Sequence, residues 1–101
     1  MNLRYTPEAI ADLREMKTYI TKVLHNAQAA KRITASILDA CSALKTFPEL
    51  GTPLEMLTGQ ASDVRYLVCE NRMVFYRAED GCVLVARVLD GRTDYLRVLM
   101  K

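Results

Sequence analysis

The sequence predicts an α+β protein in which a two-helix antiparallel hairpin packs on a small antiparallel sheet, in the order β-α-α-β-β-β with a short C-terminal tail. Apolar residues recur at spacings of three and four between residues 7 and 47, as in amphipathic helices. Residues 64–89 are instead rich in β-branched and aromatic residues. The 101 residues, 50% hydrophobic and 26% charged, have the size and composition of one soluble domain, residues 1–101.

The first helix is predicted to begin at Pro7. Thr6 is a favourable N-cap, Pro7 loses no required hydrogen bond at the first helical position, and Glu8 suits the positive end of the helix dipole. Before it, residues 1–5 form a short extended segment that can add a strand to the sheet. Apolar residues then follow as far as Leu24 and form one stripe along the helix.

A second helix is predicted between Asn26, which can cap it, and Phe47, which precedes Pro48. Its apolar stripe consists of Ala30, Ile33, Ile37, Cys41 and Leu44. Two helices joined by a short connection form an antiparallel hairpin. Because each helix has one apolar stripe, the pair needs a further surface to cover.

The last third of the chain has strand character. Residues 48–63 are rich in Pro, Gly and Thr and are expected to form a long connector with one helical turn at 54–57. Three strands are expected at 64–69, 73–78 and 82–89. The Asp80-Gly81 pair is a strong hairpin signal. Residues 93–100 are expected to form a short tail helix.

The strand arginines determine the predicted faces of the sheet, because an unpaired buried cation is costly. With three-residue loops at 70–72 and 79–81, one face carries Arg65, Leu67, Cys69, Met73, Phe75, Arg77, Val83, Val85, Arg87 and Leu89. The helices then cover the face made of Tyr66, Val68, Val74, Tyr76, Leu84, Ala86 and Val88. A two-residue turn at either loop would flip one strand.

The face turned away from the helices is predicted to be a binding surface, apolar in its middle and cationic at its ends. Arg72, Arg87 and Arg92 are expected to converge at one edge, with Asp94 and Tyr95 just beyond. Arginine suits bidentate contact with phosphate or carboxylate. Alternatively, a second copy of the chain or the C-terminal tail covers the apolar middle.

Several classes of function lack support in the sequence. Three separated cysteines without a C-x-x-C pair and a single histidine, His25, disfavour disulfide frameworks, metal sites and Cys–His nucleophiles. No phosphate-loop or hydrolase-elbow motif occurs, so no cofactor is expected. Neither a signal peptide nor an apolar run of the roughly 18–20 residues that span a bilayer is found, so we expect a cytoplasmic protein without a membrane partner.

The chain resembles toxins of the RelE/ParE superfamily, the growth-inhibiting half of bacterial type II toxin–antitoxin modules of the plasmid-stabilisation family. The similar segments are Tyr5-Thr6-Pro7-Glu8-Ala9, Asp12-Leu13, residues 44–51 (LKTFPELG), Arg65-Tyr66-Leu67-Val68, Met73-Val74-Phe75-Tyr76-Arg77 and residues 87–96. Each segment is a common pattern, but their order and spacing run nearly end to end and agree with the predicted fold. The resemblance implies a cognate antitoxin as partner, with a possible homodimer of the free toxin.

Two mechanisms exist in the superfamily. RelE-like members cleave mRNA on the ribosome without metal, and the resemblance then implies that Arg72, Arg87 and Arg92 hold the scissile phosphate while Tyr95 stacks or donates a proton. ParE-like members inhibit DNA gyrase by binding it. In either case Arg65, Arg77, Asp94 and Arg97 are the predicted contacts to RNA or to the target protein. The predicted antitoxin contacts are Leu67, Met73, Phe75 and Val85.

The chain departs from the superfamily pattern at positions that bear on this choice. Members often carry His or Tyr where Asp90 stands, Arg where Thr93 stands and an aromatic residue where Arg72 stands. Without His or Tyr at position 90, a frequent proton-transfer group is missing, and a free Asp with a pKa near 3.9 is a weak base at pH 7. The sequence therefore slightly favours a non-cleaving gyrase inhibitor over an mRNA endonuclease. A third hypothesis is an inactive homologue that only binds antitoxin.

Overall fold

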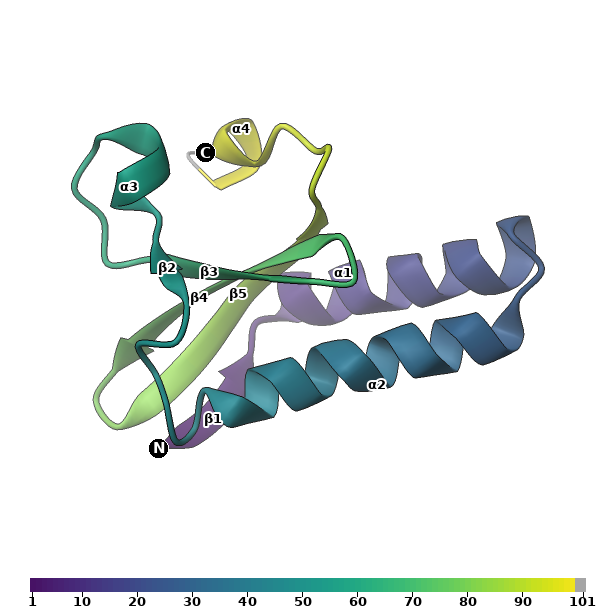
Figure 1. The fold of residues 1–101 in the computed structure, drawn as a ribbon, viewed down its shortest axis with the longest axis horizontal. Helices are drawn as coiled ribbons and strands as arrows, with labels where there is room; N and C mark the ends of the chain where they lie inside the picture. The colour runs from purple at the N-terminus through teal and green to yellow at the C-terminus, as the bar shows by residue number, and fades with distance from the viewer. Residues whose placement is uncertain (100–101) are drawn as a thin grey trace.

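The computed structural model describes residues 1–99 and arranges them as five strands and a helical hairpin (Figure 1). The strands are β1 (Asn2–Tyr5), β2 (Thr52–Pro53), β3 (Arg65–Cys69), β4 (Arg72–Glu79) and β5 (Cys82–Asp90). The helices are α1 (Pro7–Thr18), the π-helical turn η1 (Tyr19–Val23), α2 (Ala27–Ala43), α3 (Glu55–Thr58) and α4 (Tyr95–Leu99). Met100, which the sequence placed in the tail helix, lies outside the described residues.

The predicted α+β architecture is confirmed, with a sheet that is mixed rather than wholly antiparallel. The strand order is β1-β5-β4-β3-β2, and β1 pairs with β5 in parallel. The α1–α2 hairpin lies along one face of this sheet, and α3 and α4 lie on the other face (Figure 1). Within residues 1–99, no helix has both the length and the apolar character needed to cross a membrane.

Both hairpins close with two residues instead of three, so the predicted faces of β3 and of the first half of β5 are wrong. Glu70 and Asn71 form the first turn and Asp80 and Gly81 the second, with positive φ at all four residues. This is the geometry of the tight turns that match the twist of a hairpin. As a result, Leu67 and Cys69 pack against the helical core, while the predicted core residue Val68 is 68% exposed.

A β-bulge limits the error in β5 to the part of the strand before it. The two-residue turn at Asp80-Gly81 reverses the faces of residues 82–85 relative to the prediction. Phe75 lies opposite Arg87 and Tyr76 lies opposite Val85, so Ala86 has no partner in the ladder with β4, and this extra residue restores the predicted faces from Arg87 onward. Val83 and Val85, predicted on the outer face, are therefore buried under the helices, and Leu84 and Ala86, predicted to be buried under the helices, lie outside the core. The placements of Val88 under the helices and of Leu89 on the opposite face are correct.

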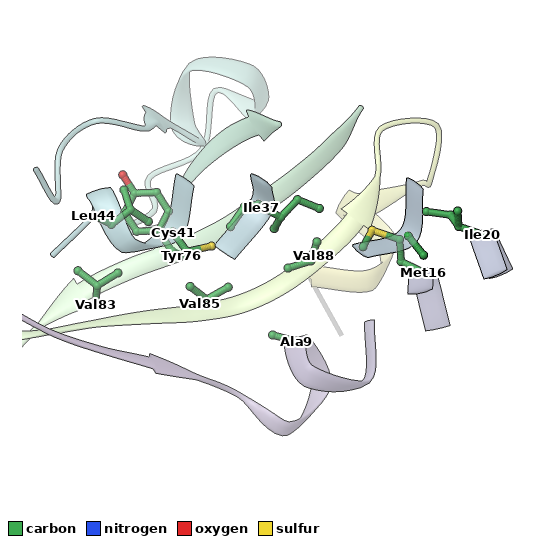
Figure 2. Close-up of a cluster of buried hydrophobic side chains, with 12 residues drawn as sticks. Ala9, Met16, Ile20, Ile37, Cys41, Leu44, Tyr76, Val83, Val85 and Val88 are labelled. Carbon is green, nitrogen blue, oxygen red and sulfur yellow. The ribbon is translucent and has the colours of Figure 1, made fainter. Parts of the chain in front are cut away.

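The main core lies between the sheet and the hairpin. Helix α1 contributes Ala9 and Met16, η1 contributes Ile20, and α2 contributes Ile37 and Cys41 (Figure 2). The strand side chains that meet them are Val74, Tyr76, Val83, Val85 and Val88. The apolar stripes of both predicted helices thus cover one face of the sheet.

A second, smaller core lies on the other face of the sheet. Met73, Phe75 and Leu89 are buried there under Leu54 from the α3 segment and Tyr95 from α4. Val98 and Leu99 of α4 pack against the same cluster. The alternative in which the C-terminal tail covers the apolar middle of this face is therefore correct.

Replacing Thr6 by alanine is expected to lower the free energy of unfolding by about 1–2 kcal/mol. The Thr6 hydroxyl oxygen accepts a hydrogen bond from the Ala9 amide (3.0 Å) and donates one to the Ala86 carbonyl (2.7 Å). Both bonds depend on the hydroxyl, so Thr6→Ser serves as the matched control and should lose little. Urea denaturation measures the difference. Equal stability of the alanine and serine variants would contradict this role of the cap.

Candidate functional site

Two arginines converge on one aspartate where β4 begins and β5 ends. Arg72 lies opposite Asp90 in the ladder, with its Nη1 atom 3.7 Å from Asp90 Oδ2. Arg92 follows two residues later and places its Nε 3.3 Å from Asp90 Oδ1 and its Nη2 3.4 Å from Oδ2. The Arg92 backbone amide donates a further bond of 2.9 Å to Oδ1. We call Arg72, Asp90 and Arg92 the Asp90 cluster.

Grooves in residues 1–99 border the Asp90 cluster on three sides. One groove, of about 720 Å³, is lined by Val68, Asn71, Arg72, Met73, Asp90, Gly91 and Arg92. A second extends toward the hairpin, where Glu15 of α1 and Tyr19 of η1 line it, and a third lies between η1, α2 and the β3–β4 turn. A backbone hydrogen bond fixes the β3–β4 turn against the end of β5, because the Gly91 amide donates to the Asn71 carbonyl (3.1 Å). The predicted convergence of Arg72 and Arg92 is confirmed by this geometry.

The charges of the Asp90 cluster stabilise one another. The pKa of Asp90 is lowered, first by the backbone hydrogen bond from Arg92 and then by the Arg92 guanidinium, while the pKa of Arg92 is raised by the same carboxylate. A lowered carboxyl pKa contributes stability that is present above the unfolded-state pKa and is lost as the pH falls through the folded-state pKa. Asp90 is therefore ionised throughout the physiological pH range.

The structure does not bring Arg87 into this cluster. Its Nε donates to Asp12 Oδ2 (2.8 Å) and its Nη2 donates to Asp12 Oδ1 (2.9 Å). The same Asp12 Oδ2 accepts a bond from the Val88 amide (2.9 Å). The hydrogen bond to Asp12 raises the pKa of Arg87. Arg87 thus joins β5 to α1 instead of facing the groove.

The other predicted target contacts are dispersed. Arg65 donates to the Gly51 carbonyl (2.8 Å) and so fastens the connector to β3. Arg77 Nη2 lies 3.8 Å from Glu79 Oε1, beside the turn at Asp80-Gly81. Asp94 and Arg97 are exposed on the C-terminal tail. The structure does not gather these four residues into one surface.

The predicted apolar and aromatic site residues lie in the two cores. The Tyr95 ring packs 5.4 Å from that of Phe75, between centroids, and so Tyr95 belongs to the second core together with Met73. Leu67 and Val85 pack under the helical hairpin. Since Val85 and Phe75 are fully buried, this structure offers neither side chain to a partner.

Sequence reasoning missed two contributors. Asp12 forms the ion pair with Arg87, and Tyr19 of η1 lines two of the grooves that border the Asp90 cluster. The π-helical turn has no sequence signal of its own, although such turns are frequent at functional sites. The polar Asp12 within an apolar-periodic helix segment was the available signal for a buried ion pair.

The family comparison places this helical hairpin on a five-stranded mixed sheet among the toxins of the RelE/ParE superfamily. Residues 3–95 match the family described as the ParE toxin of the type II toxin–antitoxin system parDE, and the chain belongs to that family.

The chain is similar to a solved chain from the chromosomal ParDE TA system of P. aeruginosa, with a TM-score of 0.74 and 21% sequence identity. The match covers 89% of this chain and 95% of the other. At that identity the likeness concerns the fold. No curated protein matches the chain.

Proposed function

We propose that this toxin arrests growth by binding DNA gyrase, without cleaving RNA, and that a cognate antitoxin neutralises it. The observation that carries the proposal is the pairing of the arginines. Arg72 and Arg92 both pair with the Asp90 carboxylate, and two nitrogens of Arg87 donate hydrogen bonds to the Asp12 carboxylate. The three guanidinium groups that would bind a scissile phosphate are each next to a carboxylate of the chain itself.

RNA cleavage of the RelE type needs groups that this site supplies poorly. A 2′-hydroxyl must be deprotonated, a phosphorane oxyanion stabilised and a 5′-oxygen protonated. Asp90 has a lowered pKa and is therefore an even weaker base than a free aspartate. The single histidine, His25, lies in the connection between η1 and α2, and it does not line any of the three grooves beside the Asp90 cluster. Inhibition by binding needs no such groups.

The antitoxin partner is supported by the family and by the solved relative. The family is described as the toxin of a toxin–antitoxin system, and the solved relative is described as a ParDE TA system. We infer that a cognate antitoxin binds this chain as well. Co-expression with the protein encoded beside it should restore growth, and copurification should yield a complex.

Induction of the chain without its antitoxin distinguishes the targets. We expect incorporation of labelled thymidine to fall within minutes, before incorporation of labelled amino acids, with intact mRNA on primer extension. Purified toxin should inhibit DNA supercoiling by gyrase, and toxin preincubated with antitoxin is the control. Early loss of translation with new codon-phased 5′ ends would overturn the proposal.

One observation favours the alternative of an mRNA endonuclease. The Arg92 side chain is 92% exposed, so its ion pair is screened by water and a phosphate has access to it. Glu15 and Tyr19 line the adjoining groove and could transfer protons. Under this alternative, Arg92→Ala abolishes toxicity while antitoxin binding persists. Growth arrest by that variant equal to wild type would exclude Arg92 from any active site.

A further inference from the structure

We propose that Asp90 acts as a built-in anion that fills a site formed by Arg72, Arg92 and the Arg92 backbone amide, and thereby keeps phosphate groups out of it. This makes Asp90 a specificity-determining residue of the groove. The inference concerns the same cluster as the proposed function, but it does not depend on gyrase being the target.

The donors of the Asp90 cluster surround both carboxylate oxygens. Oδ1 accepts bonds from the Arg92 amide (2.9 Å) and from Arg92 Nε (3.3 Å). Oδ2 accepts a bond from Arg92 Nη2 (3.4 Å) and lies 3.7 Å from Arg72 Nη1. Two guanidinium groups and a backbone N–H directed at one point are the usual recognition elements for a phosphate oxygen. Here the same donors are satisfied by a side chain of the protein.

A phosphate entering this site would meet the negative charge of Asp90. Like charges a few ångströms apart repel, and burial of either group strengthens the effect. Because the pKa of Asp90 is lowered, protonation does not relieve this repulsion near neutral pH. The phosphate would also have to separate Asp90 from donors that are fixed within two residues of it. Asp90 thus competes with phosphate for the donors of Arg72 and Arg92 at a very high local concentration.

The groove is otherwise open to a ligand of this kind. Arg92 is 92% and Asp90 34% exposed, whereas Arg72 is 18% exposed and fixed by the strand that carries it. The lining residues Asn71 and Gly91 are also exposed. Space and positive charge are therefore present, and the aspartate is the feature that opposes a phosphate.

Asp90→Asn tests the inference with little change of shape. An asparagine keeps the oxygen that accepts from the Arg92 amide but removes the negative charge. The matched control is Asp39→Asn in α2, which changes the net charge equally at an exposed position away from the Asp90 cluster and, among residues 1–99, has no side-chain hydrogen bond or ion pair to lose. The probes are inorganic phosphate, followed through the NMR signal of the Arg92 amide, and a labelled single-stranded RNA of about ten nucleotides, followed by fluorescence anisotropy.

We expect Asp90→Asn to bind RNA at least about tenfold more tightly than wild type, which is the effect of one gained charge-assisted hydrogen bond. Inorganic phosphate should shift the Arg92 amide in this variant, while Asp39→Asn should resemble wild type in both assays. A gain with RNA alone would assign the site to phosphodiesters of a polymer. A gain with both probes would assign it to phosphate in general. Either result supports the inference.

The double variant Arg72→Gln/Asp90→Asn locates the gain. Loss of the added affinity in this variant places the phosphate at the Asp90 cluster. Equal gains for Asp90→Asn and Asp39→Asn would overturn the inference, since net charge alone would then explain them. Wild-type binding as tight as that of Asp90→Asn would also overturn it, as would a folded Asp90→Asn protein without any gain. Asp90→Ser, which retains a hydroxyl acceptor, repeats the test if the asparagine variant does not fold. None of these results depends on the gyrase assay.

Discussion

Asp12→Ala is expected to lower the free energy of unfolding by about 3 kcal/mol, because the substitution leaves a partly buried cation and a strand amide without their acceptor. The Asp12 side chain is 9% exposed and the Arg87 side chain 27% exposed. Three donors use the Asp12 carboxylate, namely two nitrogens of Arg87 and the amide of Val88. Guanidine denaturation followed by circular dichroism measures the loss.

Two further variants separate the contributions of Asp12. Asp12→Asn keeps an acceptor for the Val88 amide and should lose less than the alanine variant. Glu15→Ala removes another α1 carboxylate, one that is exposed and for which no salt bridge is found among residues 1–99, and should change stability by under about 0.5 kcal/mol. Similar losses for Asp12→Ala and Glu15→Ala would show that general charge on α1, rather than the Arg87 pair, stabilises this protein.

The position of Asp12 follows from where the first strand ends. Strand β1 pairs with β5 only as far as Tyr5 opposite Val85, so the edge of β5 beyond that point has no neighbouring strand. The Thr6 hydroxyl donates a hydrogen bond to the Ala86 carbonyl, and the Asp12 carboxylate accepts one from the Val88 amide. Helix α1 therefore completes the sheet edge with side chains where backbone pairing stops.

The features that were predicted from sequence depend on local chemistry. Thr6 and Asn26 were predicted as caps, and each accepts the expected amide bond, from Ala9 and Ala29 respectively. The helical hairpin, the three sequential strands and the turn near 54–57 follow from the same local patterns. These signals lie within a few residues of the structure that they specify, so no long-range contact is needed to interpret them.

The predicted strand faces were wrong where a shift of one residue in the register changes which side chains point toward the helices. Glu70 and Asn71 both adopt positive φ, which is uncommon for residues other than glycine, so the sequence did not reveal a two-residue turn. The bulge at Ala86 has no sequence signal either. Because side chains alternate with a period of two, each two-residue turn reversed the faces of the strand segment beside it, and the bulge reversed them back within β5.

The site was predicted in part for a similar reason. Arg72 and Arg92 flank the β4 and β5 ends, so strand order alone brings them together. Arg87 also lies in β5, but its partner Asp12 comes from a helix 75 residues earlier, and no local pattern links the two. Pairing of a charged side chain with a distant carboxylate requires the packing of α1, which is a property of the folded chain.

Gly51→Ala is expected to destabilise the fold by about 3 kcal/mol, equivalent to a fall in Tm of roughly 15 °C for a domain of this size. A Cβ at this position would lie 2.6 Å from the Tyr76 hydroxyl oxygen, 2.7 Å from Tyr76 Cε1 and 2.8 Å from the Tyr66 carbonyl oxygen. All three distances are shorter than real Cβ contacts, and Tyr76 is fully buried, so its ring has no free space to enter.

The displaced tyrosine would also lose its hydrogen bonds. The Tyr76 hydroxyl donates to the Pro48 carbonyl and accepts from the Gly51 amide, both at 2.8 Å, and these bonds fix the connector over the end of the core. Gly91→Ala is the matched control, because its Cβ would approach the Asn71 carbonyl oxygen at 3.4 Å, an ordinary contact. Thermal unfolding of both variants decides the matter. If Gly51→Ala melts within about 3 °C of wild type, the connector moves away from Tyr76 without much cost, and the close approach at Gly51 is not what holds it.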